Sequence, residues 1–252
     1  MFFPIVSLLL DRKVKHRPLS IVDEIQQILD LPVNFTHTDN DLISYSTAES
    51  LGRRLALFHF LTGQPLTKKA FEYQLANALT ESGVEAIVAE SGTIAGADLL
   101  LQGGGVRLSL KTEGAKNTSR TSVTVSKLME ARWIRDCDDE QAFYRGLETR
   151  LVPHLEAYDR VLNLRSFPIP QTNDVYYELL ELPLKKILLI KNREKVTFSE
   201  VNNSGGITAT VCDEEGPVCK FTCDGSVEKI TLRGLSVERC LKHATWTIPL
   251  AG

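Results

Sequence analysis

Hydrophobic residues recur at helical spacing in the first third of the chain. Every third or fourth position is apolar over residues 20–31, 46–61 and 67–82, which predicts three amphipathic helices. The third is the clearest, because Thr67 is a suitable N-cap residue and Gly83 is a suitable residue just after the helix end. Its apolar face consists of Phe71, Leu75, Ala78 and Leu79.

The period changes from helical to alternating after residue 84. The apolar residues 99–101 follow Asp98 and begin a strand, and the glycines at 103–105 form a permissive turn. Apolar and polar residues then alternate, which predicts a second strand with one polar face. The polar positions of this second strand are Arg107, Ser109 and Lys111.

The remaining two thirds of the chain mix helical and strand patterns. Glycine- and asparagine-containing turns divide residues 195–250 into short segments, which predicts a β-rich tail. Together with the earlier elements, this pattern predicts an α/β fold. Further helices are expected over residues 126–135 and 138–162, and further strands over residues 122–125, 175–182 and 187–190.

Length and charge limit the classes of protein considered. The chain has 252 residues, enough to bury a sizeable core, and its net charge of −3 provides no global basic field. A nucleic-acid surface would therefore have to be a local concentration of lysine and arginine. The apolar run at residues 1–10 is too short to span a bilayer and has no basic start or cleavage site. We expect a cytoplasmic protein without a membrane segment.

The five cysteines suggest a reducing compartment, because an odd number does not form a complete disulfide framework. The spacings of the last four lack the C-x2-C pairs that usually build a structural zinc site. We interpret them as buried free thiols, with zinc as the alternative. The residues concerned are Cys212, Cys219, Cys223 and Cys240, together with His243.

The chemistry-bearing residues lie around the glycine turn. Asp98 opens one strand, and Lys111 lies on the polar face of the next. Hydrolysis of a phosphodiester needs oxygen ligands for a metal ion and a group that orients the attacking water. Asp98 can supply the first and Lys111 the second, and Glu72 can add a ligand from the preceding helix. The alternative is an unrelated surface aspartate and a surface lysine.

The segment after Lys111 is basic, in contrast to the acidic chain as a whole. Between residues 107 and 135 the only acids are Glu113 and Glu130. Lysine and arginine contact phosphates and guanine edges, and hydroxyls and amides add short-range donors. A DNA-binding surface is therefore predicted, with a solvated basic face as the alternative. Its candidate contact residues are Lys116, Asn117, Arg120, Ser122 and Lys127.

Asp98 and Lys111 fit a degenerate PD-(D/E)xK nuclease motif, with Ala97 at the proline position and Ser109 at the second acid position. Ordered matches along the chain make it similar to the SmaI family of type II restriction endonucleases. The matching stretches include Leu66-Thr67-Lys68, Phe71-Glu72, Glu81-Ser82-Gly83-Val84, Leu110-Lys111-Thr112-Glu113, Ala115-Lys116-Asn117 and Val125-Ser126-Lys127.

This resemblance implies a homodimer that cuts both strands of a palindromic double-stranded DNA site with Mg²⁺ and leaves 5′-phosphate ends. The site it implies is CCCGGG. It also implies a restriction-endonuclease-like core, with a central mixed β-sheet flanked by helices, plus a β-rich C-terminal part. We expect one nuclease domain over residues 1–252. Its expected parts are an N-terminal helical part (1–62), a catalytic and DNA-binding core (63–165) and the β-rich part (166–252).

The identity of the acid that replaces the one missing at Ser109 stays open at this point. Ser109 is a poor ligand, so a glutamate or the Leu110 carbonyl must complete the set. We favour Glu72, by analogy with superfamily members that take an acid from a helix before the strand. The additional acids are Glu90, which could instead cap the turn before Asp98, and Glu113, which could instead pair with Lys116.

Two alternative functions follow from the same residues. Because Ser109 replaces an acid, the chain could be a DNA-binding protein that kept a nuclease fold and lost its metal chemistry. It could also be a structure-specific repair nuclease that cuts branched or damaged DNA. Cleavage of plasmid DNA in Mg²⁺ but not in EDTA would distinguish a nuclease from a non-catalytic DNA-binding protein. A discrete banding pattern would distinguish a restriction enzyme from a repair nuclease.

Overall fold

The chain divides into two compact units, Met1–Pro32 and Val33–Gly252. In the first unit, helix α2 (Ile21–Asp30) begins after Ser20. Ser20 and Asp23 each accept a hydrogen bond from the other's backbone N–H, which caps the helix. The computed structural model describes residues 20–30, 32–89, 97–172, 174–200 and 206–249.

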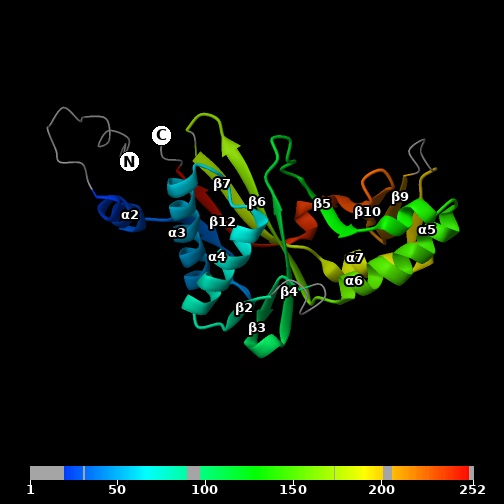
Figure 1. Cartoon of the computed structure of the whole chain (residues 1–252), viewed down its shortest axis with the longest axis horizontal. Coiled ribbons are helices and arrows are strands. Elements are labelled where there is room, and N and C mark those ends of the chain that lie inside the picture. The colour runs from blue at the N-terminus through cyan, green and yellow to red at the C-terminus, as the bar shows by residue number, and fades with distance from the viewer. Residues whose placement is uncertain (1–19, 31, 90–96, 173, 201–205, 250–252) are drawn as a thin grey trace. The chain divides into compact units, whose positions relative to one another are not determined.

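A mixed sheet lies in the second unit (Figure 1). The β4–β6 pair is parallel and every other neighbouring pair is antiparallel. Within the described residues it has seven strands in the order β1 (Asn34–His37), β12 (Leu241–Ile248), β7 (Asp174–Glu181), β6 (Arg160–Ile169), β4 (Val106–Glu113), β3 (Leu99–Leu101) and β2 (Ala86–Val88).

Two long helices, α3 (Tyr45–Thr62) and α4 (Lys68–Glu81), cover one face of this sheet (Figure 1). The Ser44 and Thr67 side chains accept hydrogen bonds from backbone N–H groups of their first turns, as N-caps do. The apolar face of α4 packs on leucines of β3 and β4, and this burial removes apolar surface from water. The buried residues of this contact are Phe71, Leu75, Leu79, Leu99, Leu108 and Leu110.

A second, antiparallel sheet is built mainly from the C-terminal part of the chain. Three short helices, α5 (Glu140–Gly146), α6 (Val152–Glu156) and α7 (Leu184–Ile187), share its hydrophobic core. Within the described residues its strand order is β5 (Ser122–Glu130), β11 (Lys229–Ser236), β10 (Gly216–Asp224), β9 (Ile207–Asp213) and β8 (Val196–Phe198).

The predicted fold class is confirmed: the chain is mixed α/β, with a central mixed sheet flanked by helices and a β-rich C-terminal part. The expected dividing line at residue 165 falls inside β6. The chain beyond this line also contributes β7 and β12 to the central sheet. Among the described residues, no helix has the length and apolar character needed to cross a bilayer.

Two predicted helices are wrong in part. Residues 126–130 continue β5 instead of starting a helix, because β5 pairs with β11 up to the Glu130–Lys229 pair. The helix expected over residues 138–162 begins with α5 and continues through a π-helical turn (Leu147–Leu151) into α6. It ends at Glu156, because the chain then enters β6 beside β4.

The strand predicted over residues 187–190 is also wrong. These residues close α7 and form a 3-10 turn, Leu188–Lys191. Ile187 and Ile190 are buried in the hydrophobic core of the second sheet. A short buried apolar run has the same sequence pattern in a helical turn as in a strand.

Candidate active site

Asp98 extends the ladder formed by β2, β3 and β4. Its N–H donates to the Leu108 carbonyl at 2.8 Å, and its carbonyl accepts from the Ala89 N–H at 3.1 Å. The Leu99–Leu108 pairing, extended by one residue, places Asp98 opposite Ser109. The Asp98 carboxylate is anchored there, because its Oδ2 accepts from the Leu110 N–H at 2.7 Å and from the Ser109 hydroxyl at 3.3 Å.

Glu72 approaches Asp98 from helix α4. It is buried, with 6% of its surface exposed, beside the apolar face that holds Phe71. The Lys68 ammonium lies between the two acids, 2.6 Å from Asp98 Oδ1 and 3.2 Å from Glu72 Oε1. Lys69 contacts the other Glu72 oxygen, Oε2, at 2.9 Å. The structure therefore brings the two predicted acids together on a single cation.

The charge of Lys68 is favoured by this position. Partial burial opposes its charged form, but its hydrogen bonds with Asp98 and Glu72 outweigh the effect and raise its pKa. Lys68 and Glu72 are one helical turn apart, so the helix itself holds them side by side.

Lys111 lies on β4, two residues after Ser109, and is half-buried. Burial lowers its pKa, while the nearby charge of Asp98 acts in the opposite direction. Among the described residues, its ammonium makes no hydrogen bond or ion pair with another side chain. A half-buried ammonium near two carboxylates is available for an incoming anion such as a phosphate.

His154 and Tyr158 lie near the same charges. Burial lowers the pKa of His154, and the charge of Lys111 contributes. Burial raises the pKa of Tyr158, and the charge of Asp98 contributes. The two rings pack edge to face with centroids 5.6 Å apart, and the buried Tyr158 hydroxyl has no hydrogen-bond partner in the part of the chain described.

The donors at Asp98 and Glu72 fit a magnesium ion. Both are carboxylates, and Mg²⁺ is commonly held by one or two protein carboxylates, with waters and substrate phosphates completing its shell. Within the described residues, no group of three or more His, Cys, Asp or Glu side chains is arranged around one point. The protein contribution would therefore be small: the Ser109 hydroxyl and the Leu110 N–H both donate to Asp98 Oδ2, so they orient this carboxylate.

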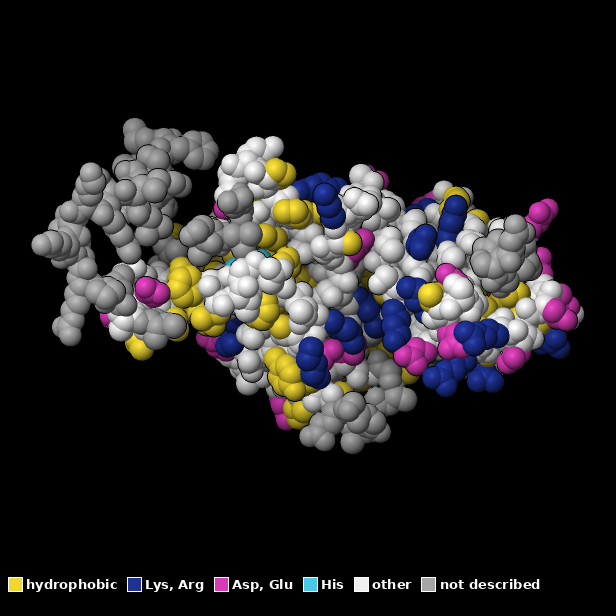
Figure 2. All heavy atoms as spheres, turned by 45° about the horizontal axis from the view of Figure 1, so that its top comes forward, with side chains coloured by type: hydrophobic (Ala, Val, Ile, Leu, Met, Phe, Trp, Pro, Cys, Tyr) yellow, Lys and Arg dark blue, Asp and Glu magenta, His cyan; other side chains and the backbone are white. Residues whose placement is uncertain are grey.

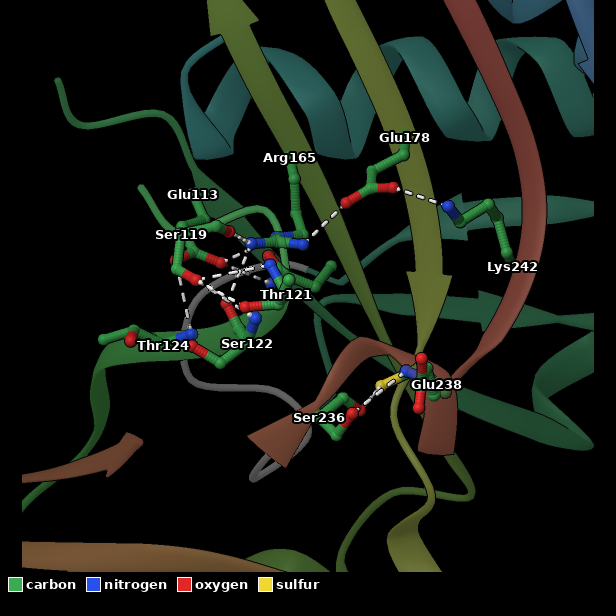
Figure 3. Close-up of polar contacts among 12 residues, drawn as sticks. Glu113, Ser119, Thr121, Ser122, Thr124, Arg165, Glu178, Ser236, Glu238 and Lys242 are labelled. Carbon is green, nitrogen blue, oxygen red and sulfur yellow. Dashed lines mark hydrogen bonds and ion pairs between the residues drawn. The ribbon is translucent and has the colours of Figure 1, made fainter. Parts of the chain in front are cut away.

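Glu113 lies in a different cluster (Figure 3). Its Oε2 accepts from Arg165 Nε at 2.9 Å, and Oε1 accepts from the Thr124 N–H at 3.3 Å. Burial raises the pKa of Glu113, although the Arg165 charge acts in the opposite direction. In the part of the chain described, Glu113 pairs with Arg165 and has no ion pair with Lys116. Glu113 is therefore the ion-pair partner of Arg165. The other candidate acid, Glu90, lies outside the described residues.

Arg165 is fully buried on β6 and has several partners. Its Nη1 donates to Glu178 at 2.6 Å, and its Nη2 donates to the carbonyls of Ser119 and Ser122. These carbonyls belong to the segment that joins β4 to β5, residues 114–121, and to the first residue of β5 (Figure 3). Arg165 thus fixes the course of the segment that carries the predicted DNA contacts.

The predicted DNA-binding residues lie on this segment and on β5. Lys116, Asn117 and Arg120 are exposed, and the Arg120 guanidinium stacks over the Phe167 ring at 4.5 Å. Lys127 is exposed and pairs with a neighbouring glutamate at 2.7 Å. Figure 2 shows lysine and arginine side chains across the middle and right of one face, interleaved with acids. The basic character is local.

Backbone and side-chain contacts hold the joining segment against β6. A Cβ at Gly114 would lie 2.4 Å from the Ser166 hydroxyl, so a side chain there would force this hydroxyl to turn away. Ser122, at the start of β5, donates its N–H to the Ser119 hydroxyl at 3.2 Å. Ser122 is half-buried, and its backbone N–H and carbonyl both hold the joining segment in place.

The cysteines considered for zinc are free thiols. Burial raises the pKa of Cys219 and Cys223 to about 12, which disfavours the thiolate that zinc binds. His243 is buried and its Nε2 lies 2.9 Å from a Glu181 oxygen.

Comparison with known proteins places the chain in a family. The profile of the SmaI family, described as a type II site-specific deoxyribonuclease, matches residues 16–248. This chain belongs to the SmaI family. It is 32% identical over 223 residues to the type II restriction enzyme SmaI of Serratia marcescens, covering 86% of this chain and 85% of that protein. No solved structure matches significantly.

Membership of the SmaI family makes the protein an endodeoxyribonuclease, a phosphodiester hydrolase of restriction systems that acts on DNA. It confirms the family resemblance that the motifs around Glu72 and Lys111 indicated. The SmaI-family match covers residues 16–248, which include Lys68, Glu72, Asp98 and Lys111.

Sequence reasoning missed three residues of the site: Lys68, His154 and Tyr158. Lys68 precedes Glu72 by four positions, and this helical spacing could have placed the two side chains together. His154 and Tyr158 carry no comparable signal, because they lie far from Asp98 and Lys111 in the sequence and only the fold brings them near these charges.

Proposed function

We propose that this protein is a magnesium-dependent type II restriction endonuclease that hydrolyses both strands of a palindromic GC-rich DNA site and leaves 5′-phosphate ends. The observation that carries the proposal is the convergence of Asp98 Oδ1 and Glu72 Oε1 on one ammonium, in a chain of the SmaI family. A pair of carboxylates that shares one cation is a suitable ligand set for Mg²⁺.

The proposed chemistry divides among three residues. Asp98 and Glu72 would hold the ion, and the Ser109 hydroxyl and the Leu110 N–H orient Asp98 by hydrogen bonds. A bound Mg²⁺ would supply Lewis-acid stabilisation of the charge that develops on the phosphate. Lys111 orients the attacking water and stabilises the same charge through its ammonium. Because Glu113 is held by Arg165, it is the weaker candidate for a ligand.

The joining segment and β5 supply the proposed DNA contacts. Arg120, Lys116 and Asn117 are exposed donors suited to guanine edges and phosphates. Lys127 and the Ser122 hydroxyl extend this surface along β5. We propose CCCGGG, the site implied by the family resemblance, as the first sequence to test.

A palindromic site calls for a two-fold symmetric protein, so we propose that the active form is a homodimer. Each protomer would cut one strand. The enzyme would act in the cytoplasm, where foreign DNA is encountered. Analytical ultracentrifugation of the protein with and without a CCCGGG duplex tests the dimer.

The central experiment is a digest of plasmid DNA with Mg²⁺ or with EDTA, followed by sequencing of the ends. We expect discrete fragments with 5′-phosphates in Mg²⁺ and no cleavage in EDTA. Asp98→Ala and Lys111→Ala should each lower cleavage at least about a thousandfold while DNA binding persists.

The matched control is Glu148→Ala, which removes an exposed acid from the π-helical turn and should cleave normally. Near-normal cleavage by Asp98→Ala would refute the assignment of the site. Cleavage confined to branched DNA would point to a structure-specific nuclease instead.

A further inference from the structure

Lys68 occupies the point on which the two proposed metal ligands converge. One oxygen of each acid is held by another group: Asp98 Oδ2 by the Leu110 N–H, and Glu72 Oε2 by Lys69. The second oxygens, Asp98 Oδ1 and Glu72 Oε1, both contact Lys68 Nζ, at 2.6 and 3.2 Å. A divalent cation bound by both acids would need these same two oxygens.

We propose that Lys68 is a built-in counter-cation that holds Asp98 and Glu72 in place before metal binds and competes with the metal for them. The inference rests on the proposed function, because it takes these two acids as the ligands. It adds a residue that sets the affinity of the site for a divalent cation.

The physical need for such a cation follows from burial. Glu72 is almost completely buried, and an ionised carboxylate removed from water is costly unless a partner compensates its charge. Asp98 adds a second negative charge that shares the same ammonium with Glu72. Without Lys68, the acids would repel each other in the metal-free protein, and this repulsion would favour their separation.

Lys68 is also able to leave. Its side chain is 43% exposed at the first turn of α4, and a lysine stem can move its ammonium into water without disturbing the backbone. An ion with two charges would then replace an ion with one charge at the same oxygens. The cost of moving Lys68 is subtracted from the metal's binding free energy, so this residue weakens metal binding.

Lys69 offers a matched control. It lies next to Lys68 in the sequence and carries the same charge, but it pairs with Glu72 Oε2 and not with Asp98, lies over the Tyr73 ring and is 64% exposed. Removing it changes the net charge by the same amount as removing Lys68. The difference between Lys68→Met and Lys69→Met therefore isolates the effect of the bridging position.

The test is a titration of the full-length, DNA-free protein with Mn²⁺, followed by the electron paramagnetic resonance signal of the free ion. We expect Lys68→Met to bind Mn²⁺ about tenfold more tightly than wild type, and Lys69→Met to change the affinity about twofold or less. Lys68→Arg, which keeps the positive charge, should bind no more tightly than wild type.

The sign of the change decides the proposal. If Lys68 only supports the structure of the site, Lys68→Met should bind Mn²⁺ more weakly, and weaker or unchanged binding would overturn the proposal. Thermal unfolding provides the second readout: saturating Mn²⁺ should raise the Tm of Lys68→Met by more than that of wild type. A variant that fails to fold would show no cooperative transition, and Lys68→Gln would replace it.

Asp98→Asn separates this proposal from the proposed function. If wild type binds Mn²⁺ through Asp98 but Lys68→Met has wild-type affinity, only the role of Lys68 is wrong. If wild type and Asp98→Asn bind Mn²⁺ equally, or if no variant binds it, the metal site is wrong and both proposals fail.

Discussion

Two clusters in this protein share a pattern of charges but differ in how exposed their central cation is. In each, one basic side chain lies between two carboxylates: Lys68 between Asp98 and Glu72, and Arg165 between Glu113 and Glu178. Lys68 is 43% exposed, whereas Arg165 is completely buried.

The number of fixed contacts explains the difference. Among the described residues, the Lys68 ammonium pairs with two carboxylates only, and a metal ion could take its place at both. The Arg165 guanidinium also donates to the carbonyls of Ser119 and Ser122, so its removal would leave backbone groups unpaired as well. The first cluster is suited to exchange of its cation, and the second to holding a segment in place. Charge composition alone does not distinguish a ligand site from a structural site.

The largest effect on stability should come from the fixed cluster. Arg165→Met leaves two buried carboxylates without their central cation, which should lower the free energy of unfolding by about 3–5 kcal/mol. Lys68→Met should lower it by less, since Lys69 still pairs with Glu72 and Asp98 keeps its hydrogen bonds from Ser109 and Leu110. Urea unfolding of both variants measures the difference.

The control is Arg165→Met combined with Glu113→Gln. Glu178 keeps its ion pair with Lys242 at 2.9 Å, whereas Glu113 loses the cation it pairs with, so removing the Glu113 charge should recover part of the loss. Equal destabilisation by Arg165→Met and Lys68→Met would break the comparison between the clusters.

The buried histidine His59, which lies outside both clusters, should make the stability of the protein depend on pH. His59 is buried, and its Nε2 lies 2.6 Å from the Tyr177 hydroxyl. Burial lowers its pKa from 6.5 to about 4. Between pH 6.5 and about pH 4, His59 is therefore protonated in the unfolded chain but neutral in the folded chain. Stability should fall over this range, by up to about 3 kcal/mol.

The measurement is chemical unfolding of wild type and His59→Gln at several pH values between 7 and 4. His59→Gln removes the titrating group and keeps a hydrogen-bonding side chain. The difference between the two proteins should shrink as the pH falls. A constant difference would show that His59 titrates normally in the folded protein.

The segment held by Arg165 should determine DNA discrimination. Arg120→Ala should weaken binding to the cognate duplex by about 1–3 kcal/mol and affect unrelated DNA much less. The stacking of Arg120 on Phe167 orients its guanidinium, so Arg120→Lys should not restore discrimination. Competition gel shifts at fixed salt measure both affinities. An equal loss on all sequences would make Arg120 a phosphate contact.

The smallest expected effect is on Mn²⁺ affinity, and it tests whether Glu72 or Glu113 is a metal ligand. Glu72→Gln should weaken Mn²⁺ binding by about tenfold, because it removes one charged ligand. Glu113→Gln should leave the affinity within about twofold, since Arg165 holds this side chain. The same resonance titration measures both variants. Weaker binding in Glu113→Gln alone would move the metal site to the other cluster.

Local patterns predicted much of this fold. The spacing in α4, its Thr67 cap and the alternation in β4 were correct, because amphipathic periodicity reports directly on which face is buried. The helix predicted over residues 126–135 is wrong, because pairing with β11, about a hundred residues away, overrides local preference. The end of α6 failed for the same reason, since β6 begins where β4 provides a partner.

The sequence by itself determined the family, the fold class and the residue types of the site, because these follow from motifs and local spacing. Only the tertiary structure decided which charges share a cation. It joined Lys68 and Glu72 of α4 to Asp98, and it joined Glu113 to Arg165 across neighbouring strands. The physical reason is that electrostatic partners are set by distance in space and by burial, and neither is a function of separation along the chain.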